Sequence, residues 1–266
     1  MAGIYIHIPF CKRRCIYCDF FSTTRNEIKA DYIHALCKEL EARKDYIGNE
    51  EIETIYLGGG TPSQLSQEEL EKIFSYIYKV YSVKGNAEIT LEANPDDLTP
   101  DYVSMLRQLP INRLSMGIQT FQEDILKLLR RRHTARQAIE AFRRCREAGF
   151  QNISTDLMYG LPGETLEIWE QDLQQAIALN PEHISAYHLI YEEGTALWQL
   201  REQHQVEETD EDLSVAFFGA LIDRLTQAGY QHYEISNFCR PDLHSRHNSS
   251  YWTGKKYLGC GPSAHS

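Results

Sequence analysis

Three cysteines near the amino terminus constrain this chain more than any other feature. Cys11, Cys15 and Cys18 leave three and then two residues between successive thiols. This spacing is typical of an iron–sulfur cubane, in which three thiolates on one tight loop hold three irons and the fourth iron stays open to a non-protein ligand. An open iron is a place for chemistry, so this loop is the first candidate site.

Clustered cysteines also occur in zinc sites and disulfides. A structural zinc ion usually needs a fourth Cys or His at close spacing, and the nearest histidine, His7, precedes the loop on an expected strand. The seven cysteines are scattered as in a reducing cytosol, and no apolar stretch of the signal-peptide type begins the chain. The cluster is therefore favoured over zinc, and a cytoplasmic location is expected. Cys37 and Cys145 lie on apolar helix faces and indicate small buried hydrophobes.

Charge and composition argue against several functions. The formal net charge is −11 over 266 residues, which argues against nucleic acid as a partner. No apolar run is long enough to cross a bilayer, and reversible docking at a membrane surface stays open. Inspection finds no low-complexity segment and no solenoid repeat, so one sizeable domain is expected.

Short β-prone runs alternate with longer amphipathic segments along the chain. Strands are expected at residues 4–8, 52–57, 87–91, 113–118, 153–158 and 184–189. Apolar residues recur at helical spacing between them, and Ser66 with Glu69 predicts a capping box at one helix start. The alternation predicts an α/β fold with a parallel sheet, either doubly wound or curled into a full or partial barrel. Periodicity alone does not choose between these.

Polar or glycine-rich motifs follow the expected strands. They are the cysteine loop, Gly-Gly-Gly-Thr-Pro-Ser at 58–63, Glu-Ala-Asn-Pro at 92–95, Gln119, and Asp156 followed by Tyr-Gly-Leu-Pro at 159–162. Because the carboxyl ends of parallel strands meet at one edge, these motifs should converge on one mouth. The glycines would let the backbone approach a ligand closely, with a tight strand-to-helix turn as the equally weighted alternative.

Four polar residues form a set that could hold a zwitterion carrying a ribose. Glu92 offers a carboxylate for an ammonium group, and Arg131 offers a guanidinium for a carboxylate. Gln119 and Asp156 offer amide and carboxylate groups for hydroxyls. Each residue is a weak signal alone, since a lone Glu or Arg is more often a solvated charge.

The Cys-x3-Cys-x2-Cys loop after a first strand, with Tyr17 before the last cysteine, resembles the radical S-adenosylmethionine (SAM) superfamily. The resemblance implies a partial (β/α)6 barrel like part of a TIM barrel. It also implies a [4Fe–4S] cluster on Cys11, Cys15 and Cys18 whose open iron is chelated by SAM. One-electron reduction would then cleave SAM to methionine and a 5′-deoxyadenosyl radical.

More narrowly, the motifs at 5–11, 58–63, 92–95, 115–121 and 156–162 resemble the oxygen-independent coproporphyrinogen dehydrogenase group and its relatives, the HemW heme chaperones, over nearly the whole chain. The resemblance implies a set of residues that bind the methionine, carboxylate, ribose and adenine parts of SAM or lie beside the cluster. These are Tyr5, Tyr17, Gly59, Gly60, Thr61, Glu92, Gln119, Arg131 and Asp156.

Three features favour the HemW branch. Coproporphyrinogen dehydrogenases carry another cysteine two positions after the third, where this chain has Phe20, and they carry a longer extension before the cluster. The run His-Asn-Ser-Ser-Tyr-Trp at 247–252 matches a HemW pattern associated with heme, and a neutral imidazole is a good axial iron ligand. From the six residues alone, a hydrogen-bonded loop histidine at His247 with Tyr251 and Trp252 in the core is the favoured alternative.

The resemblance therefore implies a heme chaperone that binds heme near His247 and delivers it to apo-hemoproteins, with respiratory ones as candidates and an electron donor for the cluster. The alternative is a coproporphyrinogen III oxidase (dehydrogenase) that forms protoporphyrinogen IX, and a third class is a cluster protein without a porphyrin ligand. Residues 1–236 are expected to form the barrel core and 237–266 the start of a C-terminal region. The final glycine-rich motif resembles a longer family motif, so a fragment or shortened form is expected.

Overall fold

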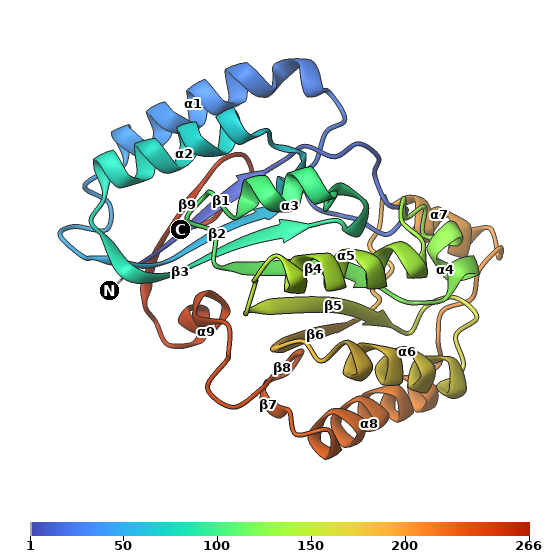
Figure 1. Ribbon diagram of the computed structural model, residues 1–266. Helices are drawn as coiled ribbons and strands as arrows, with labels where there is room; N and C mark the ends of the chain where they lie inside the picture. Colours follow the sequence, from blue (N-terminus) through green and yellow to red (C-terminus); the bar gives the residue numbers. More distant parts are fainter. Residues whose placement is uncertain (1) are drawn as a thin grey trace.

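The computed structural model describes residues 2–266, whose strands form one open, mostly parallel sheet of nine (Figure 1). The order across the sheet is β7-β8-β6-β5-β4-β3-β2-β1-β9. Neighbours from β9 to β6 are parallel, whereas β8 pairs antiparallel with β6 and β7. The strands are β1 (Ala2–Ile8), β2 (Ile52–Gly59), β3 (Val83–Ala93), β4 (Arg113–Gln119), β5 (Ile153–Tyr159), β6 (His183–His188), β7 (Gln231–Glu234), β8 (Asn237–Cys239) and β9 (Lys256–Cys260).

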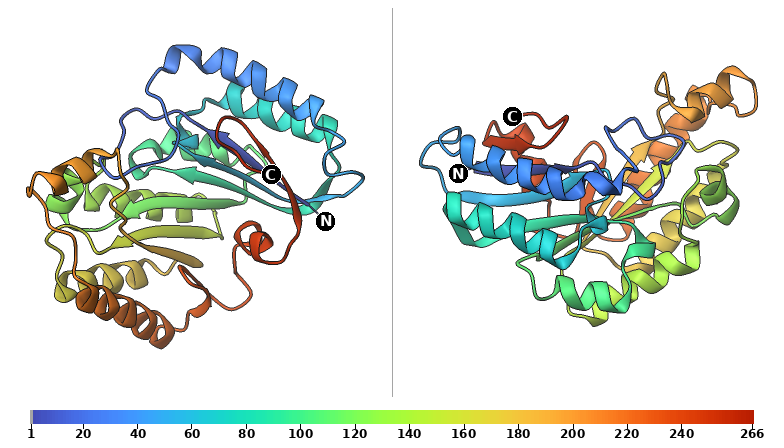
Figure 2. Two further views of the ribbon diagram at one scale, coloured as in Figure 1. Left: turned by 180° about the vertical axis from the view of Figure 1, so that it is seen from behind. Right: turned by 90° about the horizontal axis from the view of Figure 1, so that it is seen from above.

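Most of the helices cover the convex face of the curved sheet, as the two further views show (Figure 2). The helices are α1 (Lys29–Ala42), α2 (Gln67–Val80), α3 (Pro100–Leu106), α4 (Glu123–Leu128), α5 (Ala135–Glu147), α6 (Leu166–Leu179), α7 (Ala196–Glu202), α8 (Glu211–Gln227) and α9 (Arg246–Trp252). Helix α9 packs on the concave side, where His247 stacks on Tyr5 and Tyr56. Short 3-10 turns lie at Asn26–Ile28, Pro62–Gln64 and Pro95–Asp97. The partial barrel is confirmed, since the sheet is curved without closing.

Alternation along β1 shows how the strands divide their two faces. Ile4, Ile6 and Ile8 are fully buried in the main hydrophobic core with the helices. Tyr5 alternates with them and stacks on Tyr56 of β2, with ring centroids 6.1 Å apart. Because successive side chains of a strand point to opposite faces, the concave face receives aromatic and polar residues.

All six expected strands are present, each within a few residues of its expected bounds. The expected capping box is also present: the Glu69 amide donates to the Ser66 hydroxyl (3.3 Å), and the Ser66 amide donates to the Glu69 carboxylate (2.8 Å). Sequence patterns missed β7, β8 and β9, which have only 4, 3 and 5 residues. Runs this short carry almost no periodic signal.

Residues 237–266 contribute β8, α9 and β9, and β9 pairs with β1 in the same sheet. The boundary at residue 236 stays a prediction. Helix α9 lies at the amino ends of the strands, opposite the end from which the cysteine loop emerges (Figure 1). Within residues 2–266, no helix has the length and apolar character needed to cross a bilayer.

Candidate functional site

The cysteine loop is held at the carboxyl end of β1 by two backbone hydrogen bonds. The Cys11 amide donates to Thr23 O at 2.9 Å, and the Thr23 amide donates to Pro9 O at 2.7 Å. Cys11 is buried, Cys15 and Cys18 are half-buried, and all three thiols are free. The loop thus closes on itself and presents three thiols at the expected mouth.

Two side chains from other loops donate to these sulfurs. The Thr61 hydroxyl lies 3.3 Å from Cys11 Sγ, and Arg131 Nη1 lies 3.4 Å from Cys15 Sγ. Burial raises the pKa of the Cys11 and Cys18 thiols, whereas hydrogen bonds and nearby cations favour thiolates. Across residues 2–266, no three His, Cys, Asp or Glu side chains converge on one metal ion. A cubane does not require three side chains to converge on one metal ion, because each thiolate binds a different iron.

The glycine motif after β2 packs directly against the cysteine loop. The Gly60 amide donates to Ile8 O at 2.7 Å, and a Cβ at this position would lie 2.8 Å from that oxygen and from the Pro9 carbonyl carbon. Gly59 has φ +102°, and a Cβ there would meet the His7 ring at 2.7 Å. The structure therefore explains both glycines by close approach of the backbone to β1 and its loop.

Glu92 lies near the carboxyl end of β3 on the concave face. Its carboxylate accepts hydrogen bonds from the Tyr56 hydroxyl (2.8 Å) and from the Gly59 amide (3.2 Å). Burial and the nearby carboxylate of Asp156 raise the pKa of Glu92 to about 7, although both hydrogen bonds favour the charged form. Glu92 therefore changes charge near neutral pH.

Asp156, on β5, accepts from the Ser115 hydroxyl, which lies 3.0 Å from each carboxylate oxygen. Burial raises the pKa of Asp156 to about 6, while the Ser115 hydrogen bond and the Arg113 cation oppose the shift. Gln119 ends β4 in the left-handed region, with φ +72°, which is uncommon for a residue with a side chain. The structure brings Glu92 and Asp156 together on the concave face and places Gln119 on the strand between theirs.

Arg131 connects the cysteine loop with the exits of β3 and β4. Its Nη2 donates to Asn94 Oδ1 (2.7 Å) and to Gly117 O (2.5 Å), while its Nη1 lies 3.4 Å from the Tyr17 hydroxyl. Tyr17 therefore lies in the cysteine loop beside the arginine. Tyr5 lies deeper on the concave face, where its hydroxyl is 3.3 Å from His7 Nδ1.

His247 lies at the opposite end of the sheet, on α9. The side chain is 1% exposed, with Nδ1 2.8 Å from the Thr54 hydroxyl and Nε2 3.0 Å from the Tyr251 hydroxyl. Its ring also stacks on Tyr56, with centroids 5.1 Å apart. Burial lowers the pKa of His247 to about 3, so the imidazole is neutral. Tyr251 and Trp252 are exposed, at 44% and 73%.

Sequence reasoning missed Tyr56 and Arg113, which both face the concave side. Tyr56 links two candidate functional residues, since it donates to Glu92 and stacks on His247. The Arg113 side chain is 1% exposed and supplies a buried cation close to Glu92 and Asp156. The period-2 pattern of their strands could have placed both residues on this face, but it does not indicate which residues they meet.

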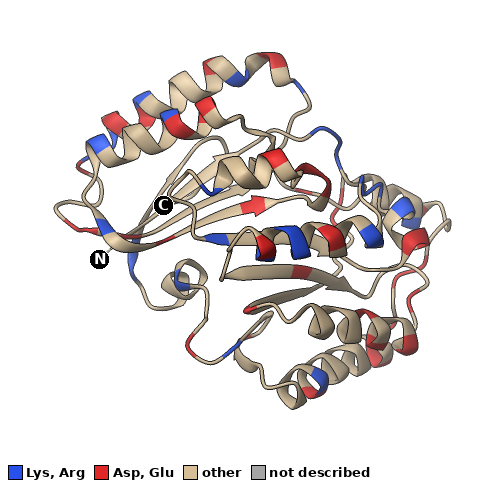
Figure 3. Ribbon diagram, in the orientation of Figure 1, with Lys and Arg blue, Asp and Glu red and all other residues tan. Residues whose placement is uncertain are grey.

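Asp97 connects the loops that surround the cysteines. Its side chain is 2% exposed and accepts from Lys12 (2.9 Å), Ser63 (2.9 Å), Gln64 (2.5 Å) and Arg132 (3.0 Å). In Figure 3 the basic stretch of the cysteine loop passes beside the acidic residues that follow β3. A buried carboxylate with this many donors ties the cysteine loop to its neighbours.

We expect Asp97→Asn to weaken this connection. An amide carries no charge for Lys12 and Arg132 and can accept fewer hydrogen bonds, so the free energy of unfolding should fall by about 1–3 kcal/mol. Reconstituted protein should also lose iron faster, measured as iron per chain over time. Asp124→Asn is the control, because Asp124 is 96% exposed and pairs with the exposed Lys127 on the surface of α4. Equal iron retention in both variants would contradict a role for Asp97 in holding the loop.

The chain is similar in sequence to a known superfamily and to known proteins. The sequence model of the radical SAM superfamily matches residues 5–176. The chain is 38% identical over its whole length to "Heme chaperone HemW" of Bacillus subtilis (strain 168), covering 70% of that protein. It is 37% identical over 98% of its length to the protein of that name in Lactococcus lactis, covering 68% of it.

A solved structure is also similar over almost the whole chain. It is the coproporphyrinogen III oxidase HemN of Escherichia coli, described as a radical SAM enzyme, with a TM-score of 0.84 and 27% sequence identity. The match covers 99% of this chain and 64% of that one. The chain thus spans about two thirds of the length of these relatives.

Proposed function

The chain belongs to the radical SAM superfamily and to its HemW branch, and from this membership we propose that it is a heme chaperone. It would bind heme and deliver it to hemoproteins. The observation that carries the proposal is the similarity to heme chaperones at 37–38% identity, which extends over 98–100% of this chain and 68–70% of those proteins. Phe20, where coproporphyrinogen dehydrogenases carry a cysteine, favours this function over the oxidase.

Membership of the superfamily implies a [4Fe–4S] cluster and SAM. We assign three irons to Cys11, Cys15 and Cys18, because their thiols share one anchored loop. When bound, the cluster and SAM supply one-electron reductive cleavage of the sulfonium. An electron donor is the partner that this chemistry requires.

For SAM we assign the residues that surround this loop. Glu92 would hold the ammonium group together with the backbone at Gly59, Gly60 and Thr61, and Arg131 would hold the carboxylate. Gln119 and Asp156 would bind ribose hydroxyls, while Tyr5 and Tyr17 would lie beside the adenine or the cluster. Arg131 is already fixed by Asn94 and Gly117, so it presents its charge with little loss of freedom.

We propose His247 as the heme ligand. Its imidazole is neutral, as iron ligation requires, and among residues 2–266 its Nε2 hydrogen-bonds to the Tyr251 hydroxyl alone. Tyr251 is 44% exposed, and an outward turn of its ring would free this nitrogen. Recipients would be apo-hemoproteins, including respiratory ones, reached from the cytoplasm or from the membrane surface.

An anaerobic heme titration of cluster-loaded protein, followed by the Soret band, tests the proposal. We expect saturable binding that His247→Ala abolishes. We expect Tyr251→Phe to tighten binding about fivefold, because the phenol no longer competes for Nε2 with a hydrogen bond worth about 1 kcal/mol. His34→Ala, on the exposed face of α1, is the control and should bind normally.

Two results would contradict parts of this proposal. Saturable binding that survives His247→Ala would remove His247 as the ligand and leave the chaperone function standing. If the unaltered chain does not bind heme saturably, the chaperone proposal fails. Conversion of coproporphyrinogen III to protoporphyrinogen IX is then the activity to assay.

A further inference from the structure

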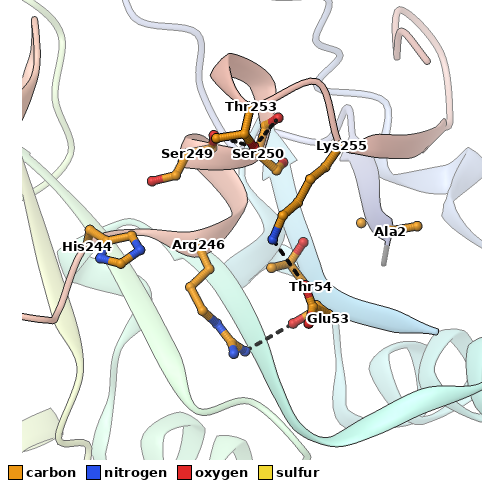
Figure 4. Close-up of a pocket in the computed structure, with 10 residues that line it drawn as sticks. Ala2, Glu53, Thr54, His244, Arg246, Ser249, Ser250, Thr253 and Lys255 are labelled. Atoms are coloured by element: carbon orange, nitrogen blue, oxygen red, sulfur yellow. Dashed lines mark hydrogen bonds and ion pairs between the residues drawn. The ribbon is translucent and has the colours of Figure 1, made fainter. Parts of the chain in front are cut away.

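A cavity at the amino ends of β1 and β2 has no role in the site at the other end of the sheet. It encloses about 180 Å³ between these strands and α9. Figure 4 shows Arg246 and Lys255 extending toward Glu53 at its floor, with Thr54 beside them and His244 to one side. The cavity therefore brings cationic side chains together in a chain whose net charge is −11.

Among the described residues, the Arg246 guanidinium has no carboxylate partner. Its Nη2 donates to the backbone oxygens of Glu53 (3.0 Å) and Asn86 (2.7 Å). No ion pair of Arg246 occurs within residues 2–266. A guanidinium carries five N–H donors in a planar fork, so most of these donors and the whole charge remain available to an anion.

Lys255 shares its carboxylate partner, Glu53, with Lys84. Its Nζ lies 3.2 Å from Glu53, which also binds Lys84 at 2.7 Å. The other carboxylate near α9, on Glu88, is occupied by the backbone amides of Arg246 and His247 at 3.1 and 3.0 Å. Of the described residues that line the cavity, Arg246 and Lys255 are cations and Glu53 is the carboxylate.

The hydroxyl groups of Ser250 and Thr253, which line the cavity, are not available to donate hydrogen bonds to an anion. Ser250 Oγ donates to His247 O (2.6 Å), and Thr253 Oγ1 donates to Ser249 O (3.2 Å). Their protons therefore satisfy carbonyl groups of α9 and are not free for a ligand. An anion in the cavity would be held by Arg246 and Lys255.

We propose that this cavity binds a carboxylate side arm of a porphyrin, namely a heme propionate, with Arg246 as its main partner. The inference rests on the proposed function and adds a recognition site to it. Cavities that enclose a whole drug-sized ligand measure roughly 300–1,000 Å³, so this one fits a side arm and leaves the macrocycle outside.

The surroundings of the cavity suit the rest of the ligand. Thr54 lines the cavity and also bonds His247 Nδ1 at 2.8 Å, so the cavity adjoins the candidate heme ligand. Tyr251 and Trp252 follow on the same helix and are 44% and 73% exposed. Exposed aromatic rings at the end of α9 offer an apolar surface for a porphyrin face.

The test compares heme with its dimethyl ester, in which both propionates are uncharged. Titrations of the cluster-loaded chain should give at least about tenfold weaker binding of the diester, the loss expected for one charge-assisted hydrogen bond. Arg246→Gln and Lys255→Gln should weaken heme binding and leave diester binding unchanged. Arg136→Gln is the matched control, since Arg136 is 86% exposed on α5 and pairs with Glu140 one turn along the same helix.

The outcomes distinguish the assignment of the cavity from the proposed chaperone function. Equal affinity of the unaltered chain for heme and its diester would overturn the cavity assignment and leave the chaperone function intact. A preference for heme that persists in both Gln variants would move the carboxylate site elsewhere. Acetate that competes with heme but not with the diester would support a carboxylate site. Absence of binding of either porphyrin would overturn both proposals.

Discussion

Replacing Cys15 by alanine is expected to leave the chain folded and without its iron–sulfur cluster. Three thiolates are the protein ligands that we assign to the cubane, so loss of one leaves a second iron without a protein ligand. Cys15 also contacts Arg131, which would lose its sulfur acceptor. After anaerobic reconstitution we expect less than about one iron per chain, against about four in the unaltered protein, and loss of the visible absorbance of the cluster.

Cys37→Ala provides the control for thiol loss. Cys37 is 2% exposed on α1 in the hydrophobic core, away from the cysteine loop. Its replacement should lower the free energy of unfolding by about 1 kcal/mol through a small cavity, with full iron content retained. Far-ultraviolet circular dichroism would verify that both variants are folded. A full cluster in Cys15→Ala would contradict the assignment of the three ligands.

The strand pattern and the cysteine spacing predicted the frame of this molecule because both are local signals. The sequence places Glu92 near the end of one strand and Asp156 within another, and the parallel arrangement then brings them to the same side of the sheet. Side-chain contacts that depend on the register between strands cannot be predicted from these local signals. That Tyr56 meets Glu92 on one side and His247 on the other follows from the pairing of β2 and β3 and from the packing of α9.

The motif around His247 shows the same limit. Its pattern was informative about family, and its composition was compatible both with a heme ligand and with a buried structural histidine. The structure places the imidazole in the interior, with a partner for each nitrogen, while Tyr251 and Trp252 are exposed. No sequence period predicts this division, because α9 has only seven residues and packs through tertiary contacts.

SAM binding is expected to weaken as the pH falls through about 7, and the response should depend on Glu92. Burial raises the pKa of this carboxyl to about 7, so it is largely charged above that pH and protonated below it. A protonated Glu92 cannot pair with the ammonium group of SAM. The dissociation constant, measured by calorimetry between pH 5 and 9, should increase by up to tenfold per pH unit on the acidic side.

Without SAM, the contribution of Glu92 to the free energy of unfolding should change with pH in the opposite direction, falling as the pH rises. A carboxyl whose pKa is raised on folding contributes stability that is fully present below its unfolded pKa, near 4.5, and is lost as the pH rises toward 7. Glu92→Gln should abolish this contribution and make SAM binding weaker by about 10- to 100-fold with less dependence on pH. An unchanged pH profile in Glu92→Gln would contradict the role of this residue.

Tyr56→Phe separates a hydrogen bond to Glu92 from simple packing. The phenylalanine ring keeps the stack on His247, whereas the hydroxyl that donates to Glu92 at 2.8 Å is lost. Because that hydrogen bond favours the charged carboxylate, its loss should raise the pKa of Glu92 further and move the acidic limb of SAM binding upward by about one pH unit. Tyr78→Phe, on the exposed face of α2, should leave the limb in place. A purely structural Tyr56 would change affinity equally at every pH, so a displaced limb identifies it as the residue that sets the charge of Glu92.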